Sequence, residues 1–350
     1  MKEKIVLKKC LGTKEGRSQL GLAFVVFTIA AASLWFAFPG AFAQGLTKWQ
    51  GEFPKTDFET RIIDLSEIGD DGNTRDSIPP VREAKYTSVD KLKDLGPLEP
   101  VLSIGINGDF RAYPLRILLW HEIVNENIGG VPVLISYCPL CNSGVVFDRR
   151  VDGQLLDFGN TGRLRHRDMV MYDKQTESWW QQFTGQAIIG GLSGKTLTAL
   201  PARLESVAKF KARAPNGKVL ISEDEGMRPY GASPYQGMDT QVIPRALRVA
   251  QFPYPLPDGI QPLERVVVVG EDAWTLAHLR ENTPVRRGGL VLTWEAGQNS
   301  IHDSQLIFRG RDVGNVIVQQ KTDNGLVDVP YDVVFAFSFS AFHPDGELHF

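Results

Sequence analysis

From Val101 onward the chain alternates short apolar runs with turn-forming residues, and this pattern predicts strands rather than long helices. Residues 101–106 have the apolar character and length of a strand. Asn107-Gly108 is a signal for a tight hairpin turn, which predicts a return strand at 110–113. Residues 115–125 place apolar side chains at helical spacing after a proline, so we expect a helix there.

The apolar pattern after this helix returns to strands. Residues 131–137 predict a second apolar strand that leads directly into Cys138, and residues 145–148 predict a third. Further short strands are expected at 170–172 and 187–189. Residues 101–222 therefore predict a β-rich module that carries one helix.

Two turn-rich stretches flank this module. Residues 44–100 are polar and irregular, and we interpret them as an N-terminal arm. Residues 223–262 are rich in Pro, Gly and Tyr and are long for a connection inside one domain, so we expect a linker or a wrapping arm. The remainder, residues 263–350, forms a second, cysteine-free β-rich module.

The second module repeats the pattern of the first. The run Arg265–Gly270 is similar to the strand at 101–105, and Gly288-Gly289 precedes an apolar run as Gly129-Gly130 does. Trp294–Gly297 stands where the first module has its cysteines. The predicted fold class is thus α+β, mostly β, with two related β-rich modules and few short helices.

The N-terminus has the pattern of an export signal. A basic segment precedes the apolar run 20–38, and Ala41-Phe42-Ala43 predicts cleavage before Gln44. The apolar run approaches the length that crosses a bilayer, so an uncleaved anchor is the alternative. Residues 1–43 are therefore expected to place the body of the protein in the periplasm or outside the cell, with membrane contact only through this segment if it stays uncleaved.

The charge of the chain excludes one class of partner. Removing residues 1–43 removes six basic and two acidic residues, which leaves 32 Lys+Arg, 39 Asp+Glu and a net charge of −7. Nucleic-acid binding requires a clustered basic face. We therefore expect no nucleic-acid partner.

The body of the chain contains two cysteines, Cys138 and Cys141, in the segment Tyr137–Gly144. Two thiols at this spacing can exchange electrons, hold a soft metal ion or form a disulfide. The apolar strand that follows predicts strand–turn–strand, whereas redox folds place such a pair at the start of a helix. All three possibilities remain open, and so does the question of whether the protein is an enzyme.

Several sequence blocks surround these cysteines in a distinctive arrangement. They are 111–118 with 121–125, 129–133 with 138–144, 147–149, and 171–173 with 176–182. In these blocks the chain resembles a family of exported prokaryotic proteins that is known only as a domain of unknown function. The resemblance implies no established activity, and no catalytic residue can be carried over from it.

A metal site at the cysteine pair would need further ligands. Thiolates select copper, zinc or iron–sulfur clusters, and one Cys-x-x-Cys supplies only half of a structural zinc site. His121 precedes the cysteine strand and His166 follows the next strand, so these two are the predicted additional ligands. Our leading hypothesis is a protein that binds copper or zinc through Cys138, Cys141, His121 and His166. The alternatives are a binding module with a Cys-x-x-Cys disulfide and a periplasmic thiol–disulfide oxidoreductase.

A second group of residues suggests a pocket for an anion or another ligand. Arg163, Arg165 and Arg167 crowd one loop, and guanidinium groups bind anions well. Tyr172 and Asp173 lie nearby in the sequence and could line the same pocket. The alternative is that the arginines form a solvated face or pair with neighbouring aspartates, and that the aromatic side chains belong to the core.

Overall fold

The computed structural model describes residues 45–70, 72–222, 228–240 and 252–350. The chain divides into two compact units, Met1–Glu52 and Phe53–Phe350. In the first unit the described residues, 45–52, are helical. The predicted signal peptide at 1–43 lies outside the described residues. Within the part of the chain that the structure describes, no helix is long and apolar enough to cross a membrane.

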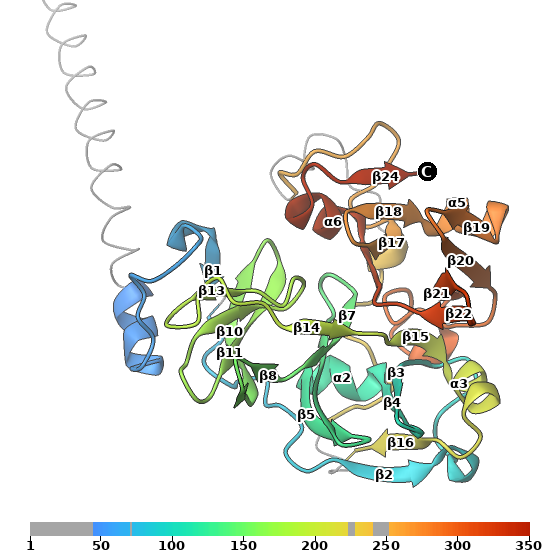
Figure 1. The fold of residues 1–350 in the computed structure, drawn as a ribbon, viewed down its shortest axis with the longest axis horizontal. Coiled ribbons are helices and arrows are strands. Elements are labelled where there is room, and N and C mark those ends of the chain that lie inside the picture. The colour runs from blue at the N-terminus through green and yellow to red at the C-terminus, as the bar shows by residue number, and fades with distance from the viewer. Residues whose placement is uncertain (1–44, 71, 223–227, 241–251) are drawn as a thin grey trace, which may run out of the picture. The chain divides into compact units, whose positions relative to one another are not determined.

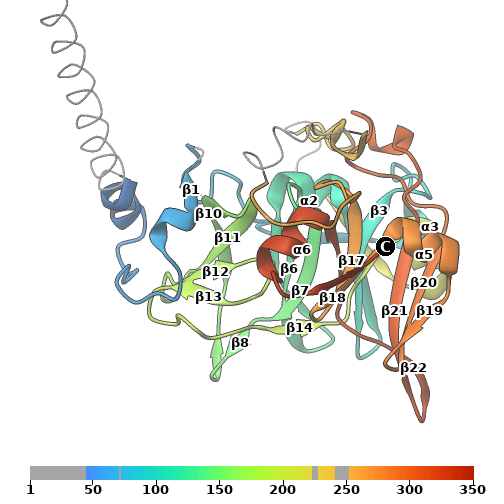
Figure 2. The ribbon, with the colours of Figure 1, turned by 90° about the horizontal axis from the view of Figure 1, so that it is seen from above.

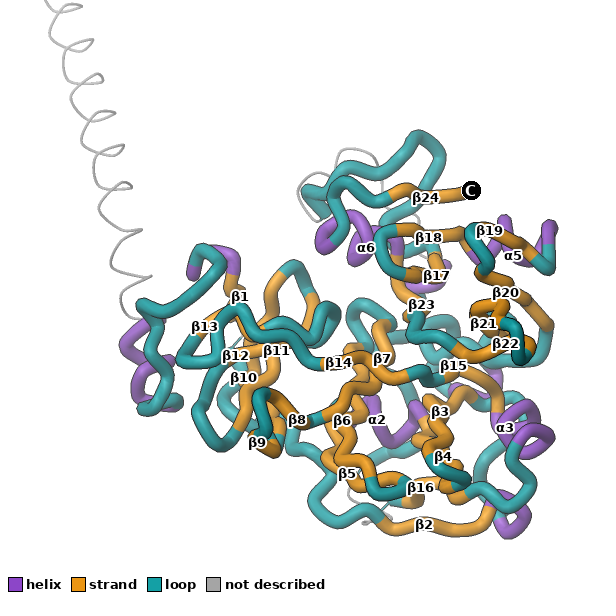
Figure 3. The backbone as a smooth tube through the Cα atoms, in the orientation of Figure 1, coloured by secondary structure: helices purple, strands orange, loops and turns teal. Residues whose placement is uncertain are grey.

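Short strands joined by loops and turns build most of the regular structure of the second unit (Figure 1), and its helices are few and short (Figure 3). The predicted class, a mostly-β α+β fold, is confirmed. Helices of seven residues each are α2 (Leu115–His121), α3 (Val207–Arg213), α5 (Leu276–Asn282) and α6 (Ala336–Phe342). The 3₁₀ turns are η1 (Leu65–Glu67), η2 (Val89–Lys91), η3 (Met238–Thr240) and η4 (Ile307–Arg309).

Two sheets form what we call the first half, residues 85–221. One has the strand order β15-β3-β4-β16-β2 and the other β14-β7-β6-β5. The strands are β2 (Lys85–Ser88), β3 (Pro100–Ile106), β4 (Asp109–Pro114), β5 (Ile123–Ile128), β6 (Val131–Cys138), β7 (Ser143–Asp148), β14 (Thr198–Leu200), β15 (Arg203–Ser206) and β16 (Lys218–Ile221).

The second half, residues 265–349, also consists of two sheets. Their strand orders are β23-β17-β18-β24 and β19-β20-β21-β22, and the β21–β22 hairpin extends beyond its neighbours (Figure 2). The strands are β17 (Arg265–Val269), β18 (Asp272–Thr275), β19 (Val285–Arg287), β20 (Leu290–Glu295), β21 (Asn315–Thr322), β22 (Gly325–Asp328), β23 (Asp332–Phe335) and β24 (Glu347–His349).

The two halves have the same topology. In the first half β15 pairs antiparallel with β3 and β16 pairs parallel with β4; in the second, β23 pairs antiparallel with β17 and β24 parallel with β18. A short helix follows each of the strands β4, β15, β18 and β23. The hairpin series β5-β6-β7 corresponds to β19-β20-β21, and β14 pairs with β7 as β22 pairs with β21. The repeat expected from the sequence is therefore a duplicated fold.

One segment interrupts the repeat in the first half. Residues 149–197, which we call the inserted segment, lie between β7 and β14. Its strands are β8 (Arg150–Val151), β9 (Gln154–Leu155), β10 (Phe158–Arg165), β11 (Asp168–Asp173), β12 (Trp179–Gln181) and β13 (Ala187–Ile189). Strand β1 (Ile68–Asp70), from the predicted N-terminal arm, extends its sheet beside β10.

The predicted helix at 115–125 is wrong at its C-terminal end. The helix ends at His121 because Glu122 adopts a left-handed conformation with φ 56°, and β5 begins at Ile123. The left-handed residue satisfies the helix end by donating its N–H to the carbonyl of Leu118. The hairpin predicted at Asn107-Gly108 is confirmed, since it joins β3 to β4 with both residues at positive φ.

Two hydrophobic cores cross the boundary between the halves. The larger contains Leu118 and Tyr137 of the first half together with Trp274 and Val318 of the second. The other surrounds both cysteines with aromatic side chains from β7, the inserted segment and the second half: Phe147, Phe158, Trp180, Phe335 and Phe337. The halves therefore fold against one another, and the cysteines lie where both halves meet the inserted segment.

Candidate functional site

The turn that carries the cysteines joins β6 to β7. Cys138 is the last residue of β6 and pairs with Ser143, the first residue of β7, as the predicted strand–turn–strand requires. Asn142 closes the turn at φ 58°, and its side chain accepts a hydrogen bond from the Tyr137 hydroxyl at 3.0 Å. Its amide donates to the carbonyl of Val333 at 2.6 Å. A left-handed asparagine with both side-chain atoms bonded holds the turn in one conformation.

Both cysteines are free and buried. Their Sγ atoms lie 3.9 Å (Cys138) and 3.3 Å (Cys141) from the carbonyl oxygen of Arg167, so the thiols donate to it. Burial raises the pKa of Cys138 and raises the pKa of Cys141 well above its ordinary value. Without a cation the pair is therefore protonated at neutral pH.

The Arg167 carbonyl comes from the tip of the β10–β11 hairpin. This two-residue turn consists of His166 at φ 53° and Arg167 at φ 66°. Glycine and asparagine are the residues that usually occupy such a turn, and each other residue there costs about 1 kcal/mol or more. Strain of this kind persists where surrounding contacts enforce it, and here it directs the hairpin tip at the thiols.

Asp168, the next residue, completes a cluster with the two cysteines. The ligand atoms of Cys138, Cys141 and Asp168 all lie within 4.8 Å of one another, and all three residues are buried. Oδ2 of Asp168 accepts hydrogen bonds from Gln181 at 2.5 Å and from the Phe183 N–H at 2.9 Å. Oδ1 is buried and has no hydrogen-bond partner among the described residues. Burial raises the pKa of Asp168 to about 7.

We call these three residues the thiol–carboxylate cluster. It brings together two thiols and a carboxyl group that are all held toward their neutral forms by burial. A buried set of this kind can exchange its protons for a metal cation, because thiolate and carboxylate are metal ligands. The same three groups would be poor nucleophiles, since thiol exchange requires an accessible thiolate.

Residues of the second half hydrogen-bond the backbone of the cysteine turn. The N–H of Phe335 donates to the Cys141 carbonyl at 2.9 Å, and the His302 ring donates from Nε2 to the Pro139 carbonyl at 2.7 Å. The Nδ1 atom of His302 accepts from Arg265 at 2.9 Å, and because arginine is only a donor, the proton of the neutral ring resides on Nε2. Burial, together with Arg265, lowers the pKa of His302 to about 3.

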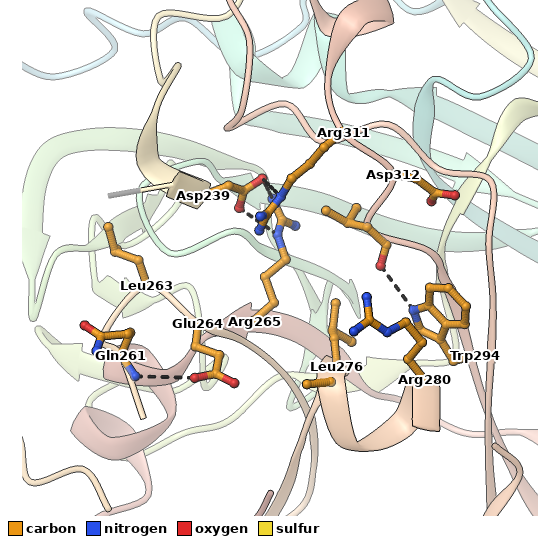
Figure 4. Close-up of a pocket in the computed structure, with 12 residues that line it drawn as sticks. Asp239, Gln261, Leu263, Glu264, Arg265, Leu276, Arg280, Trp294, Arg311 and Asp312 are labelled. Atoms are coloured by element: carbon orange, nitrogen blue, oxygen red, sulfur yellow. Dashed lines mark hydrogen bonds and ion pairs between the residues drawn. The ribbon is translucent and has the colours of Figure 1, made fainter. Parts of the chain in front are cut away.

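The carboxylate of Asp239 holds Arg265, the residue that hydrogen-bonds His302. Asp239 forms an ion pair with Arg265 at 2.9 Å, and both side chains are buried. Figure 4 shows this pair beside Arg311, whose Nε is 3.8 Å from the same carboxylate. Arg265 lowers the pKa of Asp239 to about 2 even though burial opposes the shift. The chain of contacts from Asp239 through Arg265 and His302 therefore ends on the cysteine turn.

A second carboxylate, that of the half-buried Asp332, contacts the residues that follow the turn. Asp332, the first residue of β23, accepts hydrogen bonds from the Gly144 N–H at 2.9 Å and from the Ser143 hydroxyl. Burial raises the pKa of Asp332 to about 6. Strand β23 thus fixes the start of β7, directly after the cysteine pair.

The structure places the two predicted histidine ligands in other interactions. His121 bonds the Pro79 carbonyl through Nδ1 at 2.9 Å and the Tyr230 hydroxyl through Nε2 at 2.8 Å. His166 bonds the Tyr254 hydroxyl through Nδ1 at 2.8 Å, and its Nε2 lies 3.2 Å from Glu67. Neither histidine belongs to the thiol–carboxylate cluster. The third member of the cluster is Asp168, whereas the sequence had suggested a histidine as the third ligand.

The three arginines predicted to bind an anion each have a separate partner. Arg165 pairs with Glu67 at 2.7 Å. Arg163 is fully buried and lies 3.4 Å from Asp70, and the Arg167 guanidinium stacks over the Phe252 ring at 5.1 Å.

The two non-basic members of that predicted pocket also face different neighbours. Tyr172 donates to Asp76 at 2.6 Å, and Asp173 accepts from the Trp180 indole at 2.9 Å. Because consecutive residues of a strand point to opposite faces, neighbours in sequence such as these two do not share one pocket. Both side chains serve the packing of the inserted segment.

The molecule is thus a duplicated β-rich scaffold with a buried thiol–carboxylate cluster at the contact of its halves. The chain belongs to the family described as protein of unknown function (DUF3179), whose model matches residues 75–346. That match spans both halves, the inserted segment and every member of the cluster. No curated protein and no solved structure matches the chain.

Proposed function

We propose that this protein binds one zinc ion through Cys138, Cys141 and Asp168. The observation that carries the proposal is the geometry of the cluster, in which two buried thiols and the Asp168 carboxylate have their ligand atoms within 4.8 Å of one another. The buried Oδ1 atom of Asp168 accepts no N–H or O–H hydrogen bond among the described residues, and a thiol is only a weak donor to this carboxylate. An orphaned carboxylate oxygen in a buried site is costly, and a metal ion would satisfy it.

The donor set favours zinc over copper. Two thiolates and one carboxylate together carry three negative charges. A divalent ion reduces the net charge of the buried site to −1, whereas Cu(I) leaves −2, and uncompensated charge in a buried site is expensive. Zinc accepts both sulfur and carboxylate ligands, while Cu(I) selects thiolates and thioethers.

The surrounding groups support the proposed role by fixing the ligands. Gln181 and the Phe183 N–H orient the Asp168 carboxylate, and the contacts of His302 and Phe335 immobilise the cysteine turn. Hydrogen bonds to ligands and to the backbone that carries them raise the affinity of metal sites. The Arg167 carbonyl, which accepts from both thiols, is positioned to contribute its oxygen as a fourth ligand.

The N-terminal segment fits the same proposal if it exports the chain. In an oxidising compartment a bound zinc ion keeps paired thiols reduced, because thiolates that ligate a metal are not free to form a disulfide. The protein acts in this proposal as an exported zinc-binding protein. It contacts the membrane only through the N-terminal segment when that segment is uncleaved.

Elemental analysis and native mass spectrometry of the full chain, purified without a tag, test the proposal. The expected result is one zinc per chain with both thiols reduced, lost in Cys138→Ser and in Asp168→Asn. Asp152→Asn removes an exposed carboxylate and should keep the metal. A mass lower by two protons without metal would overturn the proposal in favour of a disulfide.

A further inference from the structure

The thiol–carboxylate cluster is closed to solvent, so a cation needs a path to reach it. Cys138 is 2 % exposed, and Cys141 and Asp168 are fully buried. A metal site requires such a path as well as ligands. This inference rests on the function proposed above and concerns how the ion arrives.

A cavity of about 420 Å³ lies between the two halves, and none of its lining residues belongs to the cluster itself. Its wall includes Gly144, two residues after the cysteine turn, together with Asp332 and Phe183. The N–H of Phe183 donates to Asp168, and the N–H of Gly144 donates to Asp332. The cavity wall therefore contains Phe183, which hydrogen-bonds Asp168 of the cluster, and Gly144, which lies on the strand after the cysteine turn.

The charges of the lining distinguish this cavity from two others. The described residues that line it include Glu271, Asp332 and His343 but no lysine or arginine. The pocket in Figure 4 is lined by three arginines and three acidic residues, namely Arg265, Arg280, Arg311, Asp239, Glu264 and Asp312. A third pocket has an excess of basic residues, namely Lys91, Lys93, Arg116 and Arg228 with Asp94. A cavity lined by acidic groups and imidazole attracts cations and repels anions.

Aromatic side chains separate the cavity from the hairpin that carries Asp168. The rings of Phe183 and Phe342 stack at 4.7 Å, and Phe342 also packs edge-on against His166 at 5.4 Å. Both phenylalanines line the cavity. Both rings are half-buried, and rotation of such side chains is fast compared with local unfolding.

We propose that this cavity is a cation-selective entrance to the thiol–carboxylate cluster. Glu271 and His343, which are 2.9 Å apart at its rim, attract the divalent ion. Asp332 lines the same cavity, and the Phe183–Phe342 pair separates the ion from the cluster until the rings move. The entrance determines the rate of loading, whereas Cys138, Cys141 and Asp168 determine affinity.

The first test measures zinc association with the apo protein by stopped flow against a chromophoric chelator. Glu271→Gln should lower the association rate about tenfold at low salt, because steering is electrostatic, and should leave stoichiometry unchanged. Glu281→Gln removes the same charge from an exposed position of α5 and serves as the matched control. If Glu271→Gln changes the association rate by less than about twofold, the proposal that this cavity is the entrance is wrong.

The second test needs no metal. Cysteine modification in the reduced apo protein is compared for a cationic and an anionic methanethiosulfonate reagent. The cationic reagent should react faster, and Ala199→Phe, which fills the cavity, should slow both reagents. Equal rates for the two reagents, or no effect of Ala199→Phe, would overturn the entrance. Absence of zinc from the wild-type protein would instead overturn the proposed function, and this thiol test would still decide the role of the cavity.

Discussion

The two halves share one topology but use the same connection differently. Between β6 and β7 the link is the four-residue turn Pro139–Asn142, whereas between β20 and β21 it is the long loop 296–314. Counted from the paired glycines that precede each strand, the position of Cys138 corresponds to Gly297. The long loop of the second half supplies His302, which bonds the short turn of the first. One copy therefore carries the cluster and the other supports it.

The inserted segment makes the second difference. Residues 149–197 separate β7 from β14, whereas Asp323 and Asn324 alone separate β21 from β22. Only the insertion provides the β10–β11 hairpin, whose tip delivers Asp168 to the thiols. A duplicated scaffold thus became asymmetric through loops, which tolerate insertions better than strands do.

The contacts between the halves remain reciprocal in spite of this asymmetry. Strand β23 packs against β7, and its counterpart β15 packs against β21. The N–H of Phe335 donates to Cys141, and the N–H of the corresponding residue Ser206 donates to Asn315 at 2.7 Å. The supporting half can therefore be weakened separately from the half that carries the cluster.

The largest expected effect comes from the supporting half. Arg265→Met leaves the buried carboxylate of Asp239 without its partner, and breaking a buried ion pair in this way costs about 3–5 kcal/mol. Urea unfolding should show this loss of stability, and the two cysteines should react faster with a thiol reagent because His302 loses its orientation. Arg311→Met, at 3.8 Å from the same carboxylate and half exposed, is the control and should cost less than about 1 kcal/mol. Equal losses of stability in the two variants would contradict the role of the Asp239–Arg265 ion pair in supporting the cysteine turn.

The next effect concerns the half that carries the cluster and depends on pH. The pKa of Asp168 is about 7 in the folded protein and 3.8 without burial, so the folded state holds a proton that the unfolded state has lost between these values. Stability of the apo protein therefore falls as pH rises from about 4 to 7. Asp168→Asn removes this loss and should stabilise the apo protein by roughly 2–4 kcal/mol at pH 8.

Urea unfolding at pH 5 and pH 8 provides the measurement. The gain from Asp168→Asn should be smaller at pH 5, and Asp152→Asn, at an exposed position, should change neither value. Zinc at a hundredfold excess over its dissociation constant should stabilise the wild type by about 2.7 kcal/mol and leave Asp168→Asn unaffected. A gain that is the same at both pH values would show that burial of this charge is not its cause.

His302 should produce the opposite pH dependence. Its pKa is about 3 in the folded protein and 6.5 without burial, so below pH 6.5 only the unfolded state gains the proton. Stability should fall by about 1.4 kcal/mol per pH unit as the pH decreases from 6.5 toward 3. His302→Gln should reduce this slope, as measured by urea unfolding at pH 6, 5 and 4, with His343→Gln as an exchange outside the buried pair. An unchanged slope would show that His302 titrates normally.

The comparison of the halves also explains what the sequence could predict. Apolar runs and turn signals are local, and they correctly predicted the hairpin at 107–108, the strand–turn–strand around the cysteines and the related second half. The end of the helix at His121 was missed because it depends on Glu122 adopting a left-handed conformation, which apolar spacing does not encode. Periodicity describes one element at a time.

The composition of the cluster lies beyond such patterns. Asp168 joins the thiols because a separate hairpin folds back on the cysteine turn, with two residues in left-handed conformations. Its sequence signal was one acidic residue after a basic run, which equally predicts a surface ion pair. His302 arrives from a loop more than 150 residues away, at a position where the first half has no equivalent. Long-range contacts of this kind depend on the tertiary fold.

The smallest expected effect separates the sequence-based ligands from the structural ones. In His121→Gln and His166→Gln the chain should still bind one zinc, and the dissociation constant should change by less than about threefold, because neither ring belongs to the cluster. Zinc competition with a chromophoric chelator measures both variants beside Asp168→Asn, which should lose the metal. Loss of zinc in either histidine variant with retention in Asp168→Asn would reverse the assignment, and would mean that the β10–β11 hairpin moves away from the thiols when the ion binds.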